Sequence, residues 1–188
     1  TQNVLLRTEG DKLRLTGTNL EVTLDLWVDS QVGDKGQVLV SHKQFLDMVE
    51  SMPKEAVGLE TEKGSLGVHC QRSHIKLRTV DSTEFPPDPP ESWGNSFSLL
   101  SKELKSGFEV AFAAASDKSR PVLSGVRLEL KGGAVTLVAA DGFQLAIREI
   151  GQGVSQGEKN VLIPKDSVAV LQSLLTIPEE SVVVGLDT

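Results

Sequence analysis

Ser155 is the residue whose surroundings most resemble a catalytic motif. It lies in Gly153-Val-Ser-Gln-Gly157, which matches the G-x-S-x-G turn that exposes a serine nucleophile between a strand and a helix. That chemistry needs a histidine base later in the chain, and no histidine follows Ser155. The segment is also expected to be a loop that leads into a strand. A hydrolase around Ser155 is therefore an alternative hypothesis, which a Ser155→Ala comparison on ester substrates would test.

Cysteine and histidine are the other side chains that could attack a substrate or bind a metal. Cys70 alternates with Val68 in a β-rich stretch, which favours a small buried group over a nucleophile. One cysteine cannot form an internal disulfide, so the expected compartment is a reducing cytoplasm. His42, His69 and His74 are too few and too scattered for a metal site. We expect His69 and His74 to face solvent or a partner, and we predict no catalytic residue, no metal and no cofactor.

Composition excludes several classes of function. The 188 residues carry a formal net charge of −7, and both halves of the chain are acidic. This argues against tight binding through neutralised phosphates, although nucleic acid could be held by another route. Six Phe, two Trp and no Tyr offer no stacking platform for single strands. The sequence has no P-loop, dinucleotide fingerprint or HExxH motif, and no apolar run long enough to predict a membrane span.

An internal repeat is the most informative feature. Asn3–Asn19 is similar to Gly125–Asp141, because apolar and glycine positions recur 122 residues later. The matched pairs are Val4 with Val126, Leu6 with Leu128, Gly10 with Gly132, and Leu15 with Leu137. The match continues at an offset of 123, where Glu21–Leu24 corresponds to Gln144–Ile147 and Val38–Val40 corresponds to Val161–Ile163. At an offset of 125, Pro53–Val57 corresponds to Pro178–Val182. Small loop insertions explain this drift, so the chain contains two copies of one folding unit.

Hydrophobic periodicity predicts the elements of each copy. Strands are expected at residues 4–7, 13–17, 21–28, 57–61, 65–70, 74–79, 98–100, 126–130, 134–139, 143–150 and 161–163. Helices are expected at 41–52 with Ser41 as N-cap, at 164–175 opened by Pro164, and from a capping Ser101 with Leu104, Phe108 and Phe112 at four-residue spacing. Asp141-Gly142 is a strong turn signal between two strands. The predicted class is α+β, with repeated units of helices packed on antiparallel sheets.

Proline divides the chain into two parts. Glu84-Phe-Pro-Pro-Asp-Pro-Pro-Glu91 can be neither helix nor central strand and is expected to be an extended linker. We therefore predict two domains, residues 1–90 and 91–188.

Each copy also has a segment that the other lacks. Phe97–Ser124 has no counterpart before Asn3, and Gly64–Phe85 has none after Gly185. We expect the chain to begin inside one unit and to end inside the next, so that the first domain lacks its N-terminal part and the second its C-terminal part.

Five segments carry a family resemblance. In order they are Thr18-Asn-Leu-Glu21, Glu84-Phe-Pro-Pro87, Ser119-Arg-Pro-Val-Leu-Ser-Gly-Val126, Ala139-Ala-Asp-Gly-Phe-Gln-Leu-Ala146 and Val161-Leu-Ile-Pro-Lys165. Together, within a repeated unit, they resemble the bacterial sliding clamp, the beta subunit of DNA polymerase III. The resemblance covers essentially the whole chain.

The resemblance implies the DNA clamp fold and a role without catalysis. Family members have three similar domains, and two subunits close into a homodimeric ring that encircles duplex DNA and acts as a processivity factor in replication. The implied partners are double-stranded DNA, the DNA polymerase III catalytic subunit, the clamp loader, other proteins with a clamp-binding motif and, in full-length form, a second subunit, with no membrane. A ring holds DNA by topology, which agrees with the acidic charge. The alternative is a clamp-fold adaptor that binds proteins without encircling DNA.

The resemblance also implies a groove for partner peptides. The matching residues are Arg120, Leu123, Ala140, Gly142, Phe143, Gln144 and Leu145. Ala140, Phe143 and Gln144 stand where the family usually has Thr, His and Arg. The groove is therefore expected to be more apolar and less charged than usual, with the backbone shape of the Asp141-Gly142 turn kept.

Two further sets of residues follow from the resemblance. Lysines expected to face DNA are Lys43, Lys102, Lys105, Lys118 and Lys165. The subunit interface is matched by the strand Arg72–Leu77, in particular Arg72, His74, Ile75 and Leu77. An exposed strand edge is a template for pairing with a partner strand. Without a third domain, the chain is expected to remain a monomer.

Overall fold

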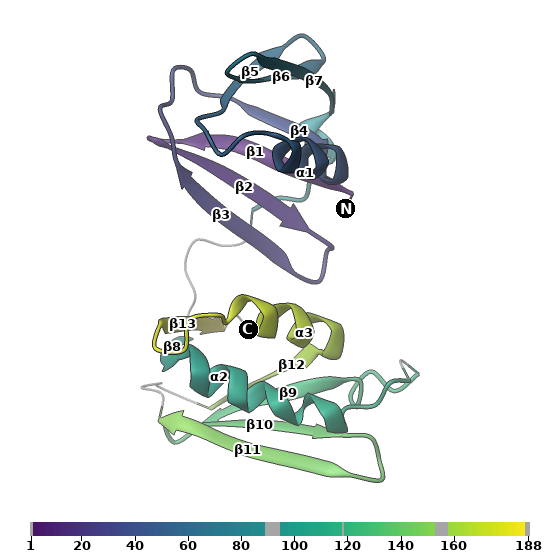
Figure 1. The fold of residues 1–188 in the computed structure, drawn as a ribbon. Coiled ribbons are helices and arrows are strands. Elements are labelled where there is room, and N and C mark those ends of the chain that lie inside the picture. The colour runs from purple at the N-terminus through teal and green to yellow at the C-terminus, as the bar shows by residue number, and fades with distance from the viewer. Residues whose placement is uncertain (1, 89–94, 118, 153–157, 187–188) are drawn as a thin grey trace. The chain divides into compact units, whose positions relative to one another are not determined.

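The computed structural model describes residues 2–88, 95–117, 119–152 and 158–186 (Figure 1). The chain divides into two compact units, Thr1–Asp88 and Pro89–Thr188. The division falls inside the proline-rich segment that the sequence marks as a linker. Each unit has its own hydrophobic core.

The first unit is an antiparallel sheet with a helix on one face. Its elements are β1 (Asn3–Glu9), β2 (Lys12–Thr18), β3 (Thr23–Asp29), β4 (Gln37–Ser41), α1 (His42–Ser51), β5 (Gly58–Glu62), β6 (Ser65–Cys70), β7 (Ser73–Val80) and the short 3₁₀ helix η1 (Ser82–Glu84). The strand order is β3-β2-β1-β4-β7-β6-β5. Met48 of α1 is buried against Leu6, Val40, Val68 and other apolar residues of the strands, which is why the helix stays on this face.

The second unit places its helices over one sheet and adds a short second sheet. Its elements are β8 (Asn95–Leu100), α2 (Ser101–Gly107), the 3₁₀ helix η2 (Phe108–Ala113), β9 (Gly125–Lys131), β10 (Ala134–Ala140), β11 (Leu145–Gln152), β12 (Lys159–Pro164), α3 (Lys165–Leu174) and β13 (Ser181–Leu186). The strand orders are β11-β10-β9-β12 and β13-β8. Figure 1 shows α2 and α3 on the same side of the larger sheet, where they close the core around Leu128 and Leu137. The predicted α+β class is confirmed in both units.

The predicted repeat is visible as strand order. β3-β2-β1-β4 of the first unit recurs as β11-β10-β9-β12 of the second. Val4 pairs with Val40, and Val126 pairs with Ile163, so the offset of 123 predicted for β4 and β12 is confirmed. Helices α1 and α3 follow at the same offset.

The offset of 123 predicted for β3 and β11 is wrong. Thr18 pairs with Thr23, and Ala140 pairs with Leu145. Both hairpins therefore turn through four residues, and the offset stays at 122 through these strands. The additional residue of the second unit is Gly151 inside β11, because Val135 pairs with Ile150 while Ala134 pairs with Gln152.

The helix that follows β8 differs from its prediction at both ends. Ser101 is the first helical residue and does not cap the helix, because the Leu100 N–H donates to the Glu103 carboxylate at 2.9 Å while the Ser101 hydroxyl is buried without a hydrogen-bond partner. The α-helix ends at Gly107 and continues as η2, whose tighter winding leaves Phe112 70% exposed while Phe108 is buried. A four-residue spacing therefore places side chains on one face only as long as the helix remains an α-helix.

Gly107 lets α2 approach the sheet closely. A methyl group at this position would lie 2.7 Å from Leu137 Cδ1 and 2.9 Å from Ile150 Cδ1. α2 packs on β11, and η2 packs on β10 and β11. The described part of the first unit has no element in the equivalent place, and Leu24, Leu26 and Val28 of β3 are exposed there.

Candidate functional site

A rigid turn joins β10 to β11 at Asp141-Gly142. The Asp141 carboxylate accepts hydrogen bonds from the backbone N–H groups of Phe143 at 2.8 Å and Gln144 at 2.9 Å. The Gln144 side-chain amide donates to the same carboxylate at 3.0 Å. These donors, the Phe143 N–H first, hold the pKa of Asp141 below its ordinary value. Gly142 has φ +97°, a conformation that favours glycine.

Arg120 lies against this turn. A Cβ atom at Gly142 would be 3.6 Å from Arg120 Nη1, an ordinary contact distance, so the guanidinium lies beside the turn. The Arg120 carbonyl accepts from the N–H groups of Leu123 at 2.9 Å and Ser124 at 3.2 Å, which fixes the loop. Leu123 in turn accepts from the Ala115 N–H at 2.9 Å. Arg120 and Gly142, which are 22 positions apart in the chain, thus lie on one surface.

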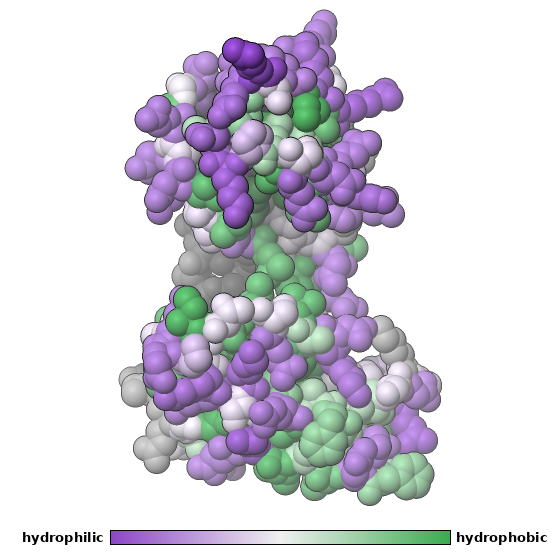
Figure 2. All heavy atoms as spheres, in the orientation of Figure 1, coloured by the Kyte–Doolittle hydropathy of each residue, from purple (hydrophilic) through white to green (hydrophobic). Residues whose placement is uncertain are grey.

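An apolar strip continues from the turn along β11. Phe143 is 99% exposed, and Leu145 and Ile147 are also largely exposed. Leu145 and Ile147 share a face because strand residues alternate, and they lie opposite Ala140 and Val138 of β10. Figure 2 shows apolar surface along the margin of the second unit where Figure 1 draws β11.

The predicted groove residues lie together in this region. Arg120 and Gly142 are adjacent, Ala140 and Leu145 pair across the strands, and Gln144 closes the turn. Leu123, in the same loop as Arg120, is half-buried. Sequence reasoning missed Ile147 and the exposed Val122, although the alternation of β11 pointed to Ile147.

The lysines predicted to face DNA have different surroundings. Lys43 is exposed on α1. Lys102 forms an ion pair with Glu179 at 2.8 Å, and Lys105 donates to the Leu175 carbonyl at 3.2 Å. Lys165 is half-buried and donates to the Ala114 carbonyl at 2.8 Å, so its ammonium already connects α3 to η2. Lys118 lies outside the described residues.

The strand predicted to form a subunit interface is β7. It pairs with β6 from Ser73 to Arg78 and with β4 at Thr79 and Val80. Among the described residues, the other edge of Ser73–Arg78 has no paired strand.

The four interface residues do not share a face of that strand. Arg72 and His74 are exposed, whereas Ile75 is half-buried and Leu77 is buried in the core with Leu66. Ile75 and Leu77 therefore offer a partner mainly their backbone groups. His74 stacks on His69 of β6 with ring centroids 6.0 Å apart.

Among the residues that the structure describes, the remaining reactive side chains do not assemble into a site. Cys70 is free and buried, as its strand position predicted, and Ser155 lies outside the described residues. In the part of the chain that the structure covers, no group of three or more His, Cys, Asp or Glu side chains is placed to hold a metal. Within the same residues, no helix is both long and apolar enough to cross a membrane.

Comparison with known proteins gives a consistent result over the whole chain. The family model for the DNA polymerase III beta subunit, N-terminal domain, matches residues 1–89, and the model for its central domain matches residues 99–188. The beta sliding clamp of Pseudomonas aeruginosa is 32% identical over 178 residues, which cover 93% of this chain and 48% of that protein. The beta sliding clamp of Vibrio cholerae is 31% identical over 189 residues, covering 98% and 51%.

Solved structures agree with the sequence relatives. The crystal structure of the Pseudomonas aeruginosa DNA polymerase III subunit beta superposes with a TM-score of 0.92 at 32% identity, over 98% of this chain and 52% of that one. The chain spans about half the length of the curated relatives it matches. The two repeated units therefore correspond to two successive clamp domains, and the chain belongs to the family of DNA polymerase III beta subunits, the bacterial sliding clamps.

Proposed function

We propose that this chain is part of a ring-forming sliding clamp, a processivity factor that encircles duplex DNA and tethers the replicative polymerase. The observation that carries the proposal is that both repeated units match successive clamp domains and superpose on a solved clamp across the whole chain. In this assignment residues 1–90 belong to the first clamp domain and residues 91–188 to the second. The protein acts by enclosure and docking, without catalysis, in the cytoplasm.

The surface around Arg120, Gly142 and Leu145 is the proposed docking groove for polymerase, clamp loader and other motif-bearing proteins. An ordered turn and exposed apolar side chains support this role, because burial of apolar anchors in a preformed site gives most of the affinity in such contacts. Phe143 is almost fully exposed and adds apolar area next to Leu145.

The proposed DNA-facing side of each unit is the side covered by helices. A net charge of −7 is compatible with this function, because an enclosing ring needs no strong electrostatic grip. Many phosphate contacts would make binding steeply dependent on salt. Lys43, Lys102 and Lys105 are exposed on helices and can supply a modest attraction.

The open edge of β7 is the proposed site of subunit closure. Between Ser73 and Arg78 this edge pairs with no other described strand, so its backbone groups can add a strand from a second subunit. Arg72 and His74 contribute exposed side chains to this contact.

A loading experiment on the full-length protein tests the proposal. The protein is loaded onto nicked circular DNA by its clamp loader, and the DNA is then cut once. A clamp should stay bound to the circle and dissociate from the linear product. Failure to load would instead support a clamp-fold adaptor that does not encircle DNA, and retention on linear DNA would contradict topological enclosure.

A further inference from the structure

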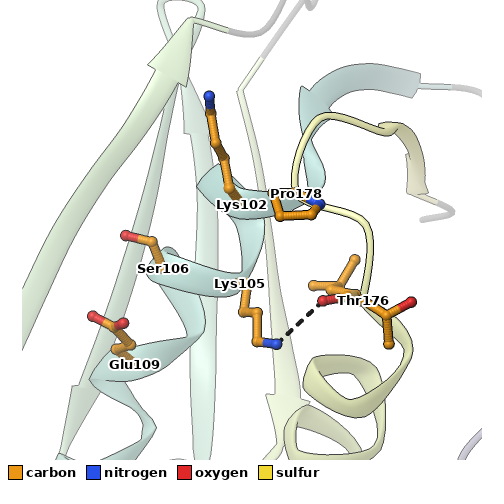
Figure 3. Close-up of a pocket in the computed structure, with 7 residues that line it drawn as sticks. Lys102, Lys105, Ser106, Glu109, Thr176 and Pro178 are labelled. Carbon is orange, nitrogen blue, oxygen red and sulfur yellow. Dashed lines mark hydrogen bonds between the residues drawn. The ribbon is translucent and has the colours of Figure 1, made fainter.

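A small hollow lies on the strands β5, β6 and β7 of the first unit, which Figure 1 draws together. It has a volume of about 70 Å³. A larger pocket, between α2 and the loop after α3, lies on the proposed DNA-facing side of the second unit (Figure 3). The polar lining of the small hollow comes from Glu60, Glu62, His69, His74 and Lys76. Imidazole and carboxylate groups therefore gather at one place on the first unit.

The strand register brings two of the three histidines side by side. His69 of β6 pairs directly with His74 of β7, and the side chains of such a pair lie on the same face of the sheet. The centroids of the two imidazole rings are 6.0 Å apart, and the ring planes are 28° from parallel. After rotation of the side chains, one metal ion can lie between the rings at about 2.0–2.1 Å from a nitrogen of each.

Two glycines keep the neighbourhood of these rings open. Gly58 of β5 pairs with His69, and a Cβ atom at Gly58 would lie only 1.9 Å from His69 Nε2. The imidazole thus occupies the space that a side chain on β5 would take. Gly67 stands between Glu60 and Lys76 across the three strands. Because Gly67 has no side chain, the space beside the histidines is left to the longer side chains around it.

Glu60 is available as a third donor. It lies two residues along β5 from Gly58 and is therefore diagonal to His69 on the same face, a separation that long side chains can span. Among the residues that the structure describes, none forms a hydrogen bond or ion pair with the Glu60 carboxylate. The Lys76 ammonium is paired with Glu62 at 2.5 Å, so the lysine in the hollow has its own counter-ion.

We propose that His69 and His74 bind one divalent transition-metal ion of the Zn²⁺ class, with the Glu60 carboxylate as third ligand. Imidazole favours Zn²⁺, Cu²⁺ and Ni²⁺, whereas Mg²⁺ and Ca²⁺ need more oxygen ligands than one carboxylate supplies. Two histidines and a glutamate leave the fourth tetrahedral position to water. The described residues contain no ready-made set of three donors, so Glu60 reaches the ion by a change of rotamer. The inference does not depend on the proposed function, since every donor belongs to the first unit.

Calorimetric titration of the 188-residue chain with ZnCl₂ tests the proposal, and MgCl₂ is the second arm. At about pH 7.5 we expect one Zn²⁺ per chain and no binding of Mg²⁺. Zinc binding should weaken as the pH is lowered to about 5.5, because protons compete with the metal for the imidazole nitrogens. Equal binding of Mg²⁺ would identify a carboxylate site and overturn the assignment to the histidines.

Histidine variants test whether the two rings act together. His69→Ala and His74→Ala should each weaken zinc binding about tenfold or more, because either change leaves a single imidazole. Glu60→Gln should weaken binding to a smaller degree. His42→Ala is the matched control and should leave the affinity unchanged, because the His42 imidazole lies outside the hollow and contacts the Gln2 carbonyl at 2.9 Å.

Backbone amide NMR during the zinc titration locates the site. We expect the largest shift changes at residues 58–60, 67–69 and 74–76. Shift changes centred on His42, or a wild-type affinity in either His69→Ala or His74→Ala, would overturn the proposal. Circular dichroism shows whether each variant is folded. If an alanine variant does not fold, His69→Gln and His74→Gln replace it, because glutamine keeps a polar side chain without the imidazole.

Discussion

Arg14 and Asp25 form a two-bond ion pair across β2 and β3. Arg14 Nε lies 2.9 Å from Asp25 Oδ1, and Arg14 Nη2 lies 3.0 Å from Asp25 Oδ2. The same guanidinium donates to Glu9 at 2.9 Å and lies 5.3 Å from the ring centroid of Trp27. The Arg14 side chain is only 11% exposed, so this network connects three strands through a largely desolvated charge.

Asp25→Asn tests the stability of this network. The substitution keeps the shape of the side chain but leaves the guanidinium without its two-bond partner, and we expect the first unit to lose about 1–2 kcal/mol in free energy of unfolding. Urea unfolding followed by circular dichroism measures the loss. Asp29→Asn on the same strand is the control, because Asp29 is 94% exposed and should change stability by less than about 0.5 kcal/mol. Equal effects of the two variants would contradict a special role for Asp25.

Acid should remove the contribution of Asp25. Burial raises the pKa of Asp25, but hydrogen bonds from Arg14 and Thr16 outweigh it, and the folded-state pKa lies below the ordinary value of 3.8. A carboxyl group whose pKa is lower in the folded than in the unfolded state stabilises the fold at pH values above its unfolded-state pKa. This contribution is lost as the pH falls through the folded-state pKa. The stability difference between wild type and Asp25→Asn should therefore be constant from pH 7 to about pH 5 and shrink below about pH 4. A difference that persists to about pH 2 would rule out this linkage.

Gly125→Ala should destabilise the second unit. A methyl group there would lie 2.5 Å from the carbonyl oxygen of Ile163, so the pairing of β9 with β12 must shift, at a cost of about 1–3 kcal/mol. Gly58→Ala is the matched control. Its methyl group would meet the imidazole of His69, which is the end of a rotatable side chain on the outer face of the sheet, and we expect a loss of less than about 1 kcal/mol. Thermal unfolding of both variants makes the comparison, and a larger loss for Gly58→Ala would contradict it.

Leu20→Gly should stabilise the first unit. Leu20 has φ +76° in a turn that repeats the turn at Gly142, with Asn19 in the place of Asp141. The left-handed conformation costs an L-residue roughly 1–2 kcal/mol, and glycine adds about 0.5–1 kcal/mol of unfolded-state entropy. Because the Leu20 side chain is 75% exposed, little burial is lost, and we expect a net gain of about 0.5 kcal/mol in unfolding experiments.

The equivalent change in the second unit should have the opposite sign. Gly142→Ala places a side chain at φ +97° and should cost about 1 kcal/mol. A loss of stability in Leu20→Gly would show that the exposed leucine makes a contact that offsets its strain.

Leu145→Asp should abolish docking of a clamp-binding-motif peptide on the full-length protein. A carboxylate in the middle of the apolar strip would be desolvated by the bound peptide, and we expect affinity to fall by about a hundredfold or more. Calorimetry measures the change. Val183→Asp is the control, since Val183 is an exposed apolar strand residue of the same unit outside the strip. Unchanged binding by Leu145→Asp would reject the groove assignment.

The strands, two of the helices and the repeat could be predicted because their signals are local. Alternation predicted β6 and β10, and the proline-opened and serine-preceded helices lie within one residue of their expected positions. The groove turn could be predicted as well, because Asp141-Gly142 encodes its conformation in two adjacent residues.

Contacts between residues far apart in the chain could not be predicted. Lys105 and Lys165 were expected to face DNA as ordinary lysines of a helix, yet each donates to a backbone carbonyl, 70 and 51 positions away. Leu77, which the resemblance places at an interface, has its side chain buried in the core of the first unit. The residue types and their spacing thus decided which elements form and in what order they repeat. Packing decided which charges are paired, which face is buried and where a pocket opens. These properties depend on neighbours that only the folded chain brings together.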